Sequence, residues 1–383
     1  MTRPLDSSGL DAGFRVPRRH FAIEALIHLE PGQRMAIFGT SGAGKTTILE
    51  AIAGEVKLES GEIWLDGLLT NCSRRRGRRS AVPVPPRERG IAAVRQPTTL
   101  FPHLTVFDNV TYGIRKQPPS AEWPAGRAAA ERTAAGPSAE RPAGPTAIQL
   151  ADDLLDRVGL GGFARARPQQ LSGGQRQRVA IARALARPFR ALLLDEPFSA
   201  VDVPSRRVLR EATIDTSAAQ GAVAMLVTHD LAEAQAFGHT IAVVDAGRIL
   251  QTGQAAVIAR RPESRRAAEL LGYTTFVPSP DGGSWALHPD RFLVGRHEGA
   301  GPVFAGVVRA CRPAGTRFAC ELECTGVEES PRRDGCESIL TLRIEVRVEV
   351  APSLGTELVV TADVPPNVTS FPGGGQEGGR SSV

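Results

Sequence analysis

The sequence predicts an α/β fold in which helices cover both faces of a mostly parallel sheet, followed by a small all-β domain. Continuous apolar runs such as Ala191–Leu194 and Ala222–Val227 are typical of strands buried on both faces. Helical patterns separate these runs, which favours parallel strands joined by crossover helices. From about Tyr273 the pattern changes to short β-rich runs divided by turn residues, which indicates a separate barrel-like domain.

Composition limits the class of protein. The chain has 383 residues, of which 42% are hydrophobic, so it is expected to fold; no apolar run approaches the ~20 residues that a membrane helix needs. The net charge of +5 is matched by the arginine run Arg74–Arg79, so no extended basic face for nucleic acid is expected. Met1–Arg19 is polar and lacks a signal-peptide core, which predicts synthesis in the cytosol. The five cysteines are odd in number and dispersed, which favours reduced thiols.

The first part of the chain gives further elements in order. Strands are predicted at Met35–Phe38 and Ile91–Val94, with a helix at Thr46–Ala53 between them. Residues 117–147 are rich in Pro, Ala, Gly and Ser, so we interpret them as a surface insertion. A helix at Ile148–Val158 and a hairpin over Ile241–Leu250 complete this part, which we expect to occupy residues 1–265.

The second part is expected to be a β-rich domain over residues 273–372, with a disordered glycine-rich tail at 373–383. Its predicted strands are Trp285–Leu287, Val303–Val308, Arg317–Leu322, Ile339–Val350 and Glu357–Val364.

The segment Gly39–Thr46 matches the P-loop pattern G-x-x-x-x-G-K-[ST] between a strand and a helix. In such a loop, backbone N–H groups surround phosphate oxygens, Lys45 reaches the β- and γ-phosphates, and the Thr46 hydroxyl holds Mg²⁺. Only three of the 46 Lys and Arg residues are lysines, so a lysine at this motif position weighs against an accidental glycine-rich turn. The residues predicted to bind nucleotide phosphates are Gly39, Thr40, Ser41, Gly42, Ala43, Gly44, Lys45, Thr46 and Thr47.

An acidic pair follows the strand at Ala191–Leu194. Asp195 stands where a carboxylate at the edge of the sheet can hold Mg²⁺, and Glu196 is placed to polarise an attacking water. The alternative is a strand-end acidic pair that caps the next helix. The P-loop in the same chain favours the nucleotide-site interpretation.

The segment Leu171–Arg178 (LSGGQRQR) contains a second candidate anion cradle. Ser172 is a natural N-cap for a helix at Gln175–Leu185, and Gly173 and Gly174 precede that helix. One nucleotide already has its P-loop, so the second cradle is expected to serve a partner subunit. The alternative is a glycine-rich helix cap without a ligand.

Together these motifs resemble those of the ATP-binding-cassette (ABC) ATPases. The P-loop, LSGGQ, LLLDEP, SAVD (Ser199–Asp202) and Thr228-His229-Asp230 occur in that family's order and spacing, over residues 14 to 262. The resemblance implies a RecA-like P-loop NTPase core with an antiparallel β subdomain and a helical subdomain at about 97–185. It also implies a head-to-tail dimer in which each ATP lies between one P-loop and the partner's Ser172, Gly173, Gly174 and Gln175.

The same resemblance assigns further roles. His229 would contact the γ-phosphate, Asp202 would carry communication across the dimer, and Gln96 would sense the γ-phosphate, Mg²⁺ and water. An aromatic residue upstream of the P-loop is expected to stack on adenine, with Phe14 the first candidate and Phe21 the second. Either ring could instead belong to the core.

Within the family, Gln96–Val106 (QPTTLFPHLTV) resembles the importer subset, in which this segment begins the groove that receives a permease helix. Leu100, Phe101 and Pro102 would supply apolar contact there, unless they are core. The family usually has Phe before the Gln; here Arg95 stands there and Pro97 follows, which puts the local coupling geometry in question.

The importer resemblance implies membrane permease partners, an indirect substrate-binding protein, and a location on the cytoplasmic face of the membrane. The P-loop wording looks most like that of molybdate-type importers, with sulfate, iron and polyamine types close behind. The β-rich part over residues 273–372 resembles the small regulatory barrel that is appended to such importer ATPases. Importers of ferric iron, polyamines or sugars remain alternatives, as does a soluble ABC ATPase outside transport.

Overall fold

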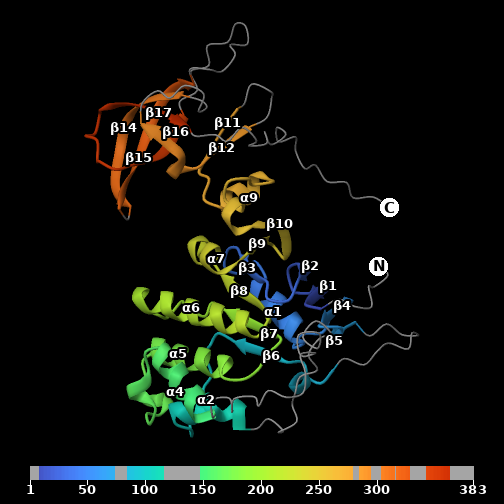
Figure 1. Ribbon diagram of the computed structural model, residues 1–383. Coiled ribbons are helices and arrows are strands. Elements are labelled where there is room, and N and C mark those ends of the chain that lie inside the picture. The colour runs from blue at the N-terminus through green and yellow to red at the C-terminus, as the bar shows by residue number, and fades with distance from the viewer. Residues whose placement is uncertain are drawn as a thin grey trace, which may run out of the picture. The chain divides into compact units, whose positions relative to one another are not determined.

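The computed structural model describes residues 8–73, 84–115, 147–278, 284–294, 303–314, 316–327 and 342–362 (Figure 1). The predicted insertion (apart from residue 147), the arginine run Arg74–Arg79 and the tail at 373–383 lie outside these residues. The chain divides into two compact units, Met1–Ala255 and Ala256–Val383. The division comes before the position 265 at which the first domain was expected to end.

The first unit contains a ten-stranded sheet with the order β5-β4-β1-β2-β10-β9-β3-β8-β7-β6. Strands β9, β3, β8, β7 and β6 are parallel neighbours, whereas β5, β4, β1 and β2 pair antiparallel. The strands are β1 (Leu10–Pro17), β2 (Ala22–Leu29), β3 (Arg34–Phe38), β4 (Ser60–Leu65), β5 (Leu68–Cys72), β6 (Ile91–Val94), β7 (Ala191–Asp195), β8 (Val223–Thr228), β9 (Thr240–Asp245) and β10 (Arg248–Gln254). The predicted parallel core, antiparallel β subdomain and hairpin are confirmed.

Helices cover both faces of the parallel strands. The helices described before the junction are α1 (Lys45–Ala53), α2 (Val106–Arg115), α4 (Ala147–Arg157), α5 (Gly173–Leu185), α6 (Val203–Ala219) and α7 (Leu231–Phe237), of which α1, α5 and α7 contact the sheet directly. Along β7 the side chains alternate: Leu193 packs in the core on the α1 side, and Leu192 and Leu194 pack in the core with α5, α6 and α7. This alternation on a fully buried strand explains the continuous apolar run that predicted it.

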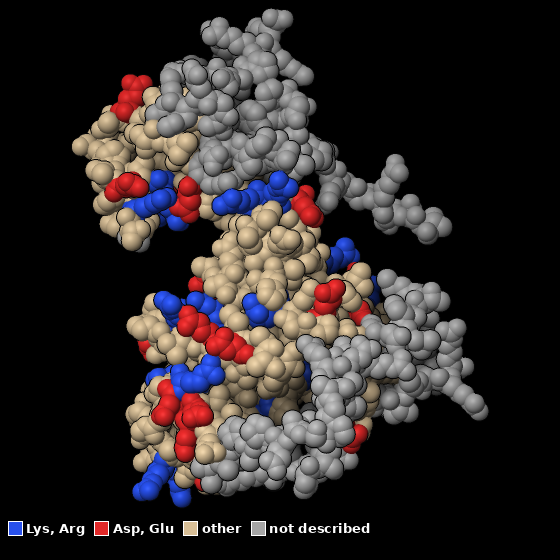
Figure 2. Space-filling model, in the orientation of Figure 1, with Lys and Arg blue, Asp and Glu red and all other residues tan. Residues whose placement is uncertain are grey.

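Helices α2, α4 and α5 pack against one another and form the predicted helical subdomain (Figure 1). Val110, Leu155 and Ile181, one from each helix, are fully or almost fully buried in one shared core. On the face shown in Figure 2, acidic and basic side chains of the described residues are intermixed.

The second unit contains a five-stranded antiparallel sheet with the order β13-β17-β14-β15-β16. Its outer strands β13 and β16 also contact each other, so the sheet closes nearly into a barrel, as predicted. A two-stranded sheet, formed by β11 and β12, follows the helix α9 along the chain. The elements are α8 (Ala255–Ile258, at the junction), α9 (Arg265–Leu270), β11 (Thr275–Pro278), β12 (Ser284–Leu287), β13 (Phe292–Val294), β14 (Val303–Ala314), β15 (Arg317–Val327), β16 (Leu342–Val348) and β17 (Glu357–Ala362).

In the part of the chain that the structure describes, no helix combines the length and apolarity needed to cross a membrane.

Candidate functional site

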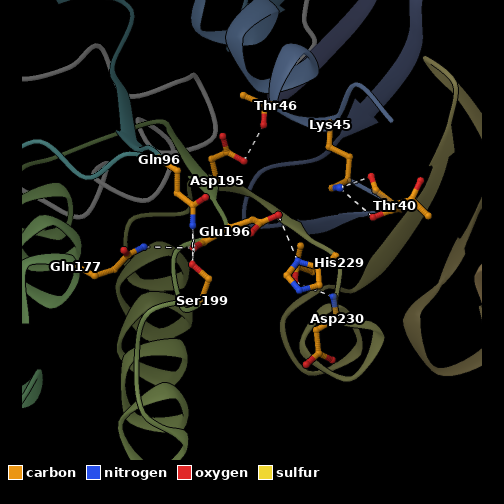
Figure 3. A network of polar contacts seen from close by, with 12 residues as sticks. Thr40, Lys45, Thr46, Gln96, Gln177, Asp195, Glu196, Ser199, His229 and Asp230 are labelled. Carbon is orange, nitrogen blue, oxygen red and sulfur yellow. Dashed lines mark hydrogen bonds and ion pairs between the residues drawn. The ribbon is translucent and has the colours of Figure 1, made fainter. Parts of the chain in front are cut away.

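The candidate site lies at the carboxyl ends of β3, β7 and β8, which are parallel neighbours. Each strand leads into one predicted motif: the P-loop follows β3, Glu196 follows β7, and His229 follows β8. Because the ends of parallel strands meet at one edge of the sheet, motifs far apart in sequence are brought together there (Figure 3).

The P-loop ends in the first turn of α1. Gly44 is the N-cap, with a φ of 100°, and no side chain caps the helix. A left-handed backbone of this kind favours glycine, and a Cβ here would stand 2.3 Å from the Cδ1 atom of Ile23. The first-turn N–H groups of α1 are therefore not used by a side-chain cap, as an anion-binding helix start requires.

Lys45 is buried at the centre of this loop. Its Nζ donates hydrogen bonds to the carbonyl oxygens of Gly39 at 2.9 Å and Thr40 at 2.8 Å. Burial lowers the pKa of Lys45, while the negative charges of Glu196 and Asp195 act in the opposite direction. The ammonium group is thus bonded to backbone carbonyl oxygens and lies near two carboxylates. These bonds can be exchanged for bonds to phosphate oxygens.

Thr46 and Asp195 form the candidate metal site. The Thr46 hydroxyl donates to the Asp195 carboxylate at 3.1 Å, although the two residues are 149 positions apart. Burial raises the pKa of Asp195, and the hydrogen bond from Thr46 opposes that shift. A desolvated carboxylate next to a hydroxyl, with Gln96 lining the same small pocket, is an oxygen donor set that fits Mg²⁺.

Glu196 has an unusual backbone and a well-defined neighbour. Its φ is 44°, a left-handed value that is uncommon outside glycine and is often found at functional sites. Its carboxylate lies 3.3 Å from the Nδ1 atom of His229. Glu196 and His229, two of the three residues predicted to be catalytic (the third is Gln96), are therefore in contact, on the loops after β7 and β8.

The backbone carbonyl of Glu196 accepts hydrogen bonds from three side chains (Figure 3). These are Gln96 Nε2 at 3.2 Å, Gln177 Nε2 at 3.3 Å and Ser199 Oγ at 2.9 Å. Gln96 also donates to Ser199 Oγ at 2.6 Å, and Gln177 accepts from Thr98 at 3.1 Å. The segment that begins with Gln96 is therefore tied to the Glu196–Ser199 loop after β7 and to α5.

Sequence reasoning did not single out Gln177 as a site residue. It is buried on α5, five residues after the predicted N-cap Ser172. A polar side chain on the buried side of an otherwise apolar helix face was the signal, because a buried amide needs partners.

Sequence reasoning also missed Arg18. Its guanidinium donates to the Thr47 hydroxyl at 2.9 Å and to Glu50 at 2.5 Å, so the predicted phosphate contact of Thr47 is shared with this arginine. No spacing in the sequence connects the β1–β2 turn to α1.

The second cradle, at the start of α5, has a different structure. Ser172 Oγ accepts from the Gln175 N–H at 3.2 Å, and Gln175 Oε1 accepts from the Ser172 N–H at 2.8 Å. Ser172, Gly173 and Gly174 are at the surface or partly exposed. A Cβ on Gly174 would stand 2.7 Å from the carbonyl oxygen of Ala200, so this glycine permits close contact with the SAVD segment.

Asp202 ends the SAVD segment and caps α6. Its carboxylate accepts from the Ser205 N–H at 3.0 Å, and this bond lowers the pKa of Asp202. Asp202 is exposed.

The two candidate adenine-stacking rings differ in accessibility. Phe14 is only 6% exposed and packs in the core on the α1 side, so stacking on a base would require its ring to leave that core. Phe21 lies in the β1–β2 turn and is partly buried. The geometry therefore favours the second candidate, Phe21, over the first.

Arg95 and Pro97, the two departures from the family pattern, flank Gln96. Arg95 forms an ion pair with Glu55 and lines the same small pocket as Thr46 and Asp195. The Gln96–Pro97 peptide bond is cis. Gln96 nevertheless contacts Glu196 and Ser199 in the loop after β7.

A pocket of about 320 Å³ opens on the helical subdomain. Leu100 and Phe101, two of the three residues predicted to contact a permease, line it; Pro102 is exposed nearby. The Phe101 ring lies 4.3 Å from the Tyr112 ring and is covered by the Arg183 guanidinium at 5.3 Å. Arg183 also donates to the Thr99 carbonyl at 2.8 Å. The pocket is thus lined both by apolar side chains and by the guanidinium groups of Arg183 and Arg187.

Comparisons with known proteins match this chain to ATP-binding proteins of ABC transporters. Residues 25–199 match the profile of the family described as ABC transporter. The Fe(3+) ions import ATP-binding protein FbpC of Mesorhizobium japonicum is 40% identical over 260 residues, which cover 67% of this chain and 63% of that protein. The chain therefore spans less than two thirds of that relative's length.

Two further relatives carry other substrates in their names. The sulfate/thiosulfate import ATP-binding protein CysA 2 of Chromobacterium violaceum is 38% identical over 285 residues, covering 72% of this chain and 68% of that protein. The molybdate/tungstate import ATP-binding protein WtpC of Thermococcus kodakarensis is 35% identical over 250 residues, covering 65% of each chain.

Proposed function

The chain belongs to the ABC transporter family of ATP-binding proteins, and from that membership we propose that it hydrolyses ATP as the energising subunit of an uptake transporter. One observation carries the proposal: the P-loop, the Gln96 segment, α5 and His229 all contact one acidic pair, Asp195 and Glu196. The relatives named above are all import ATP-binding proteins.

The proposed chemistry follows from the side chains at the site. Lys45 and the N-terminus of α1 bind the phosphates and neutralise part of their charge. Glu196 accepts a proton from the attacking water, and His229, 3.3 Å from its carboxylate, orients it and contacts the γ-phosphate. Thr46, Asp195 and Gln96 would hold Mg²⁺, which supplies charge neutralisation at the phosphates when bound.

We assign the second cradle to a partner subunit. In a head-to-tail homodimer, Ser172, Gly173, Gly174 and Gln175 of one subunit would cover the ATP held by the partner's P-loop. The exposure of this helix start supports the assignment, since a surface group is free to meet another chain. Binding of ATP would then close the dimer, and hydrolysis would weaken it.

The pocket beside Phe101 is the proposed docking site for the membrane permease. Its mixed lining of apolar and arginine side chains suits an amphipathic helix. Such docking would place the protein at the cytoplasmic face of the membrane and link it indirectly to a substrate-binding protein.

The transported substrate that we propose is an oxyanion such as molybdate or sulfate; ferric iron, a polyamine or a sugar is the alternative.

The Glu196→Gln variant tests the catalytic assignment. The amide keeps the shape of the side chain but cannot accept the proton, so turnover should fall about 100-fold or more while ATP is still bound. Sedimentation with ATP should detect a stable dimer. The matched control is Glu62→Gln, at an exposed position on β4. Hydrolysis by Glu196→Gln at the wild-type rate would refute the role of Glu196.

The permease assignment is tested by co-expression with the transporter's membrane subunits. Phe101→Asp puts a charge into the pocket and should abolish co-purification, whereas ATP binding stays unchanged. Leu26→Asp is the control, because Leu26 is 70% exposed on β2. Association with ribosomes or DNA in place of a permease would favour the soluble ABC ATPase.

The substrate is identified by reconstituting the complex in liposomes. Binding proteins loaded with molybdate, sulfate, ferric iron or a polyamine are added in turn, and the one that stimulates ATP hydrolysis names the substrate. Stimulation by an oxyanion-loaded protein is the expected result; stimulation by the iron- or polyamine-loaded protein alone would overturn it.

A further inference from the structure

Two cysteines face each other across the hairpin of β14 and β15. Cys311 and Cys320 are directly paired in the strand register, and their Sγ atoms are 2.7 Å apart. Directly opposed residues of an antiparallel pair have Cα atoms about 4.5–5.5 Å apart, within the range that a disulfide spans. The backbone therefore already holds the two sulfurs in a position to bond.

The surroundings of the two thiols differ. Cys320 is fully buried in the core of the second unit, and Cys311 is partly exposed at its margin. Burial, the hydrogen bond with Cys311 and the proximity of that thiol raise the pKa of Cys320 to about 12. Cys320 therefore keeps its proton, and Cys311 is the sulfur that a dissolved reagent meets first.

We propose that Cys311 and Cys320 form an oxidative modification site, at which a peroxide converts the two thiols into a cross-strand disulfide. The proposal is independent of the nucleotide site and of the transport function.

The reaction proceeds in two balanced steps. The Cys311 thiolate attacks one oxygen of hydrogen peroxide, which gives the sulfenic acid of Cys311 and releases hydroxide. The Cys320 sulfur then attacks the Cys311 sulfur, and the sulfenic hydroxyl leaves with the Cys320 proton as water. In total, two thiols lose two electrons and two protons, and one peroxide becomes two waters.

Cys324 provides an internal comparison. It lies four residues after Cys320 on the same strand and is also fully buried, and burial raises its pKa to about 11. It faces Gly306, where a Cβ would stand 2.6 Å from its sulfur, so glycine opposes it in place of a second thiol. Cys320 and Cys324 are both buried on β15, but only Cys320 has a second thiol opposite it on β14.

The test is peptide mapping of the full-length protein. Reduced protein is treated with hydrogen peroxide, remaining thiols are blocked with N-ethylmaleimide, and the digest is analysed by mass spectrometry with and without dithiothreitol. The expected product is a dithiothreitol-sensitive peptide that joins Cys311 to Cys320 and weighs two hydrogens less than its parts. The cross-link should also raise the melting temperature of the second unit by several degrees.

Variants separate this pair from general thiol oxidation. Cys324→Ser should form the Cys311–Cys320 peptide as the wild type does, and Cys311→Ser should not form it. In Cys320→Ser, Cys311 should stop at the sulfenic acid, which dimedone labels. The proposal is overturned if wild-type protein leaves both thiols open to N-ethylmaleimide under peroxide, or if Cys311 bonds another cysteine instead.

Discussion

The N-termini of α1 and α5 are both glycine-rich helix starts that suit a phosphate, yet they differ in how their N–H groups are used. At α1 the N-cap is Gly44 and no side chain caps the first turn. At α5 Ser172 and Gln175 form a complete capping box. The first helix start is therefore open toward its own site, and the second is satisfied within its own chain.

This difference shows how two similar motifs acquire separate tasks. Lys45 is buried beside Asp195 and Glu196, so a phosphate at α1 meets a site whose cations and carboxylates are already in place. A phosphate at α5 must compete with the capping box on an exposed surface. We therefore assign ATP binding to α1, and dimer closure around bound ATP to α5.

The largest expected effect comes from removing the lysine of the α1 site. Lys45→Ala should weaken ATP binding at least about 100-fold, because the ion pair with the phosphates is lost. Calorimetric titration with ATP measures the affinity. Lys57→Ala, at an exposed position after the same helix, should bind ATP as the wild type does. Equal affinities for the two variants would contradict the assignment of Lys45.

The second-largest effect is expected from a substitution at the N-terminus of α5. Ser172→Arg in the Glu196→Gln background should abolish the ATP-dependent dimer, since the bulky side chain blocks the cradle, while each monomer binds ATP with unchanged affinity. Sedimentation velocity and titration measure the two properties. Ser264→Arg makes the same N-cap change on α9, with a similar cost of about 1 kcal/mol in stability. Loss of ATP affinity in Ser172→Arg would place this serine in its own chain's site.

A smaller effect on turnover is expected when the contacts between α5 and the loop that carries Glu196 are removed. Gln177 bonds the Glu196 carbonyl and Thr98, so Gln177→Leu should lower kcat about 10-fold and leave ATP affinity unchanged. Thr98→Val removes one of the same bonds, and the double variant should lose less than the sum of both losses. Additive losses would show that the two residues act separately.

The smallest effect concerns stability and pH. Burial raises the pKa of Asp195, so ionised Asp195 costs folding free energy that appears as pH rises through its folded pKa. Asp195→Asn should raise the melting temperature of the nucleotide-free protein by a few degrees at neutral pH. The gain should shrink as pH falls toward about 4, the ordinary value for aspartate.

Thermal scans with and without ATP and magnesium check this prediction. Asp153→Asn, exposed on α4, should leave the melting temperature unchanged at every pH. A melting temperature of Asp195→Asn below that of the wild type at neutral pH would contradict the account.

The sequence predicted the fold where apolar runs and motif spacing are regular. The strands at β3, β6 and β7 and the helix α1 begin and end within one residue of their predicted bounds. In the second unit it predicted β12, β14, β15, β16 and β17, because turn residues separate these runs, but it missed the short strands β11 and β13. The contacts of Thr46 with Asp195 and of Glu196 with His229 agree with a motif order that brings strand ends together.

Contacts between side chains from unrelated segments were not predictable. Arg18 reaches Thr47, and Gln177 reaches Glu196, through tertiary packing that leaves no spacing in the sequence. Phe14 was the first candidate for stacking on adenine, but it lies in a strand whose alternation points its ring inward. The paired register of Cys311 and Cys320 depends on a hairpin with irregular pairing, so counting cysteines did not find it.

The central prediction is that the N-terminus of α5 contacts the ATP bound at the P-loop of another chain, and cross-linking between subunits tests it directly. Subunits with Ser41→Cys and subunits with Ser172→Cys are prepared in the Glu196→Gln background, with the five native cysteines changed to serine. They are mixed and treated with a short bis-maleimide, with and without ATP. The account predicts a covalent dimer that needs both kinds of subunit and ATP. Cross-linking that is independent of ATP, or none in the ATP-bound mixture, would contradict it.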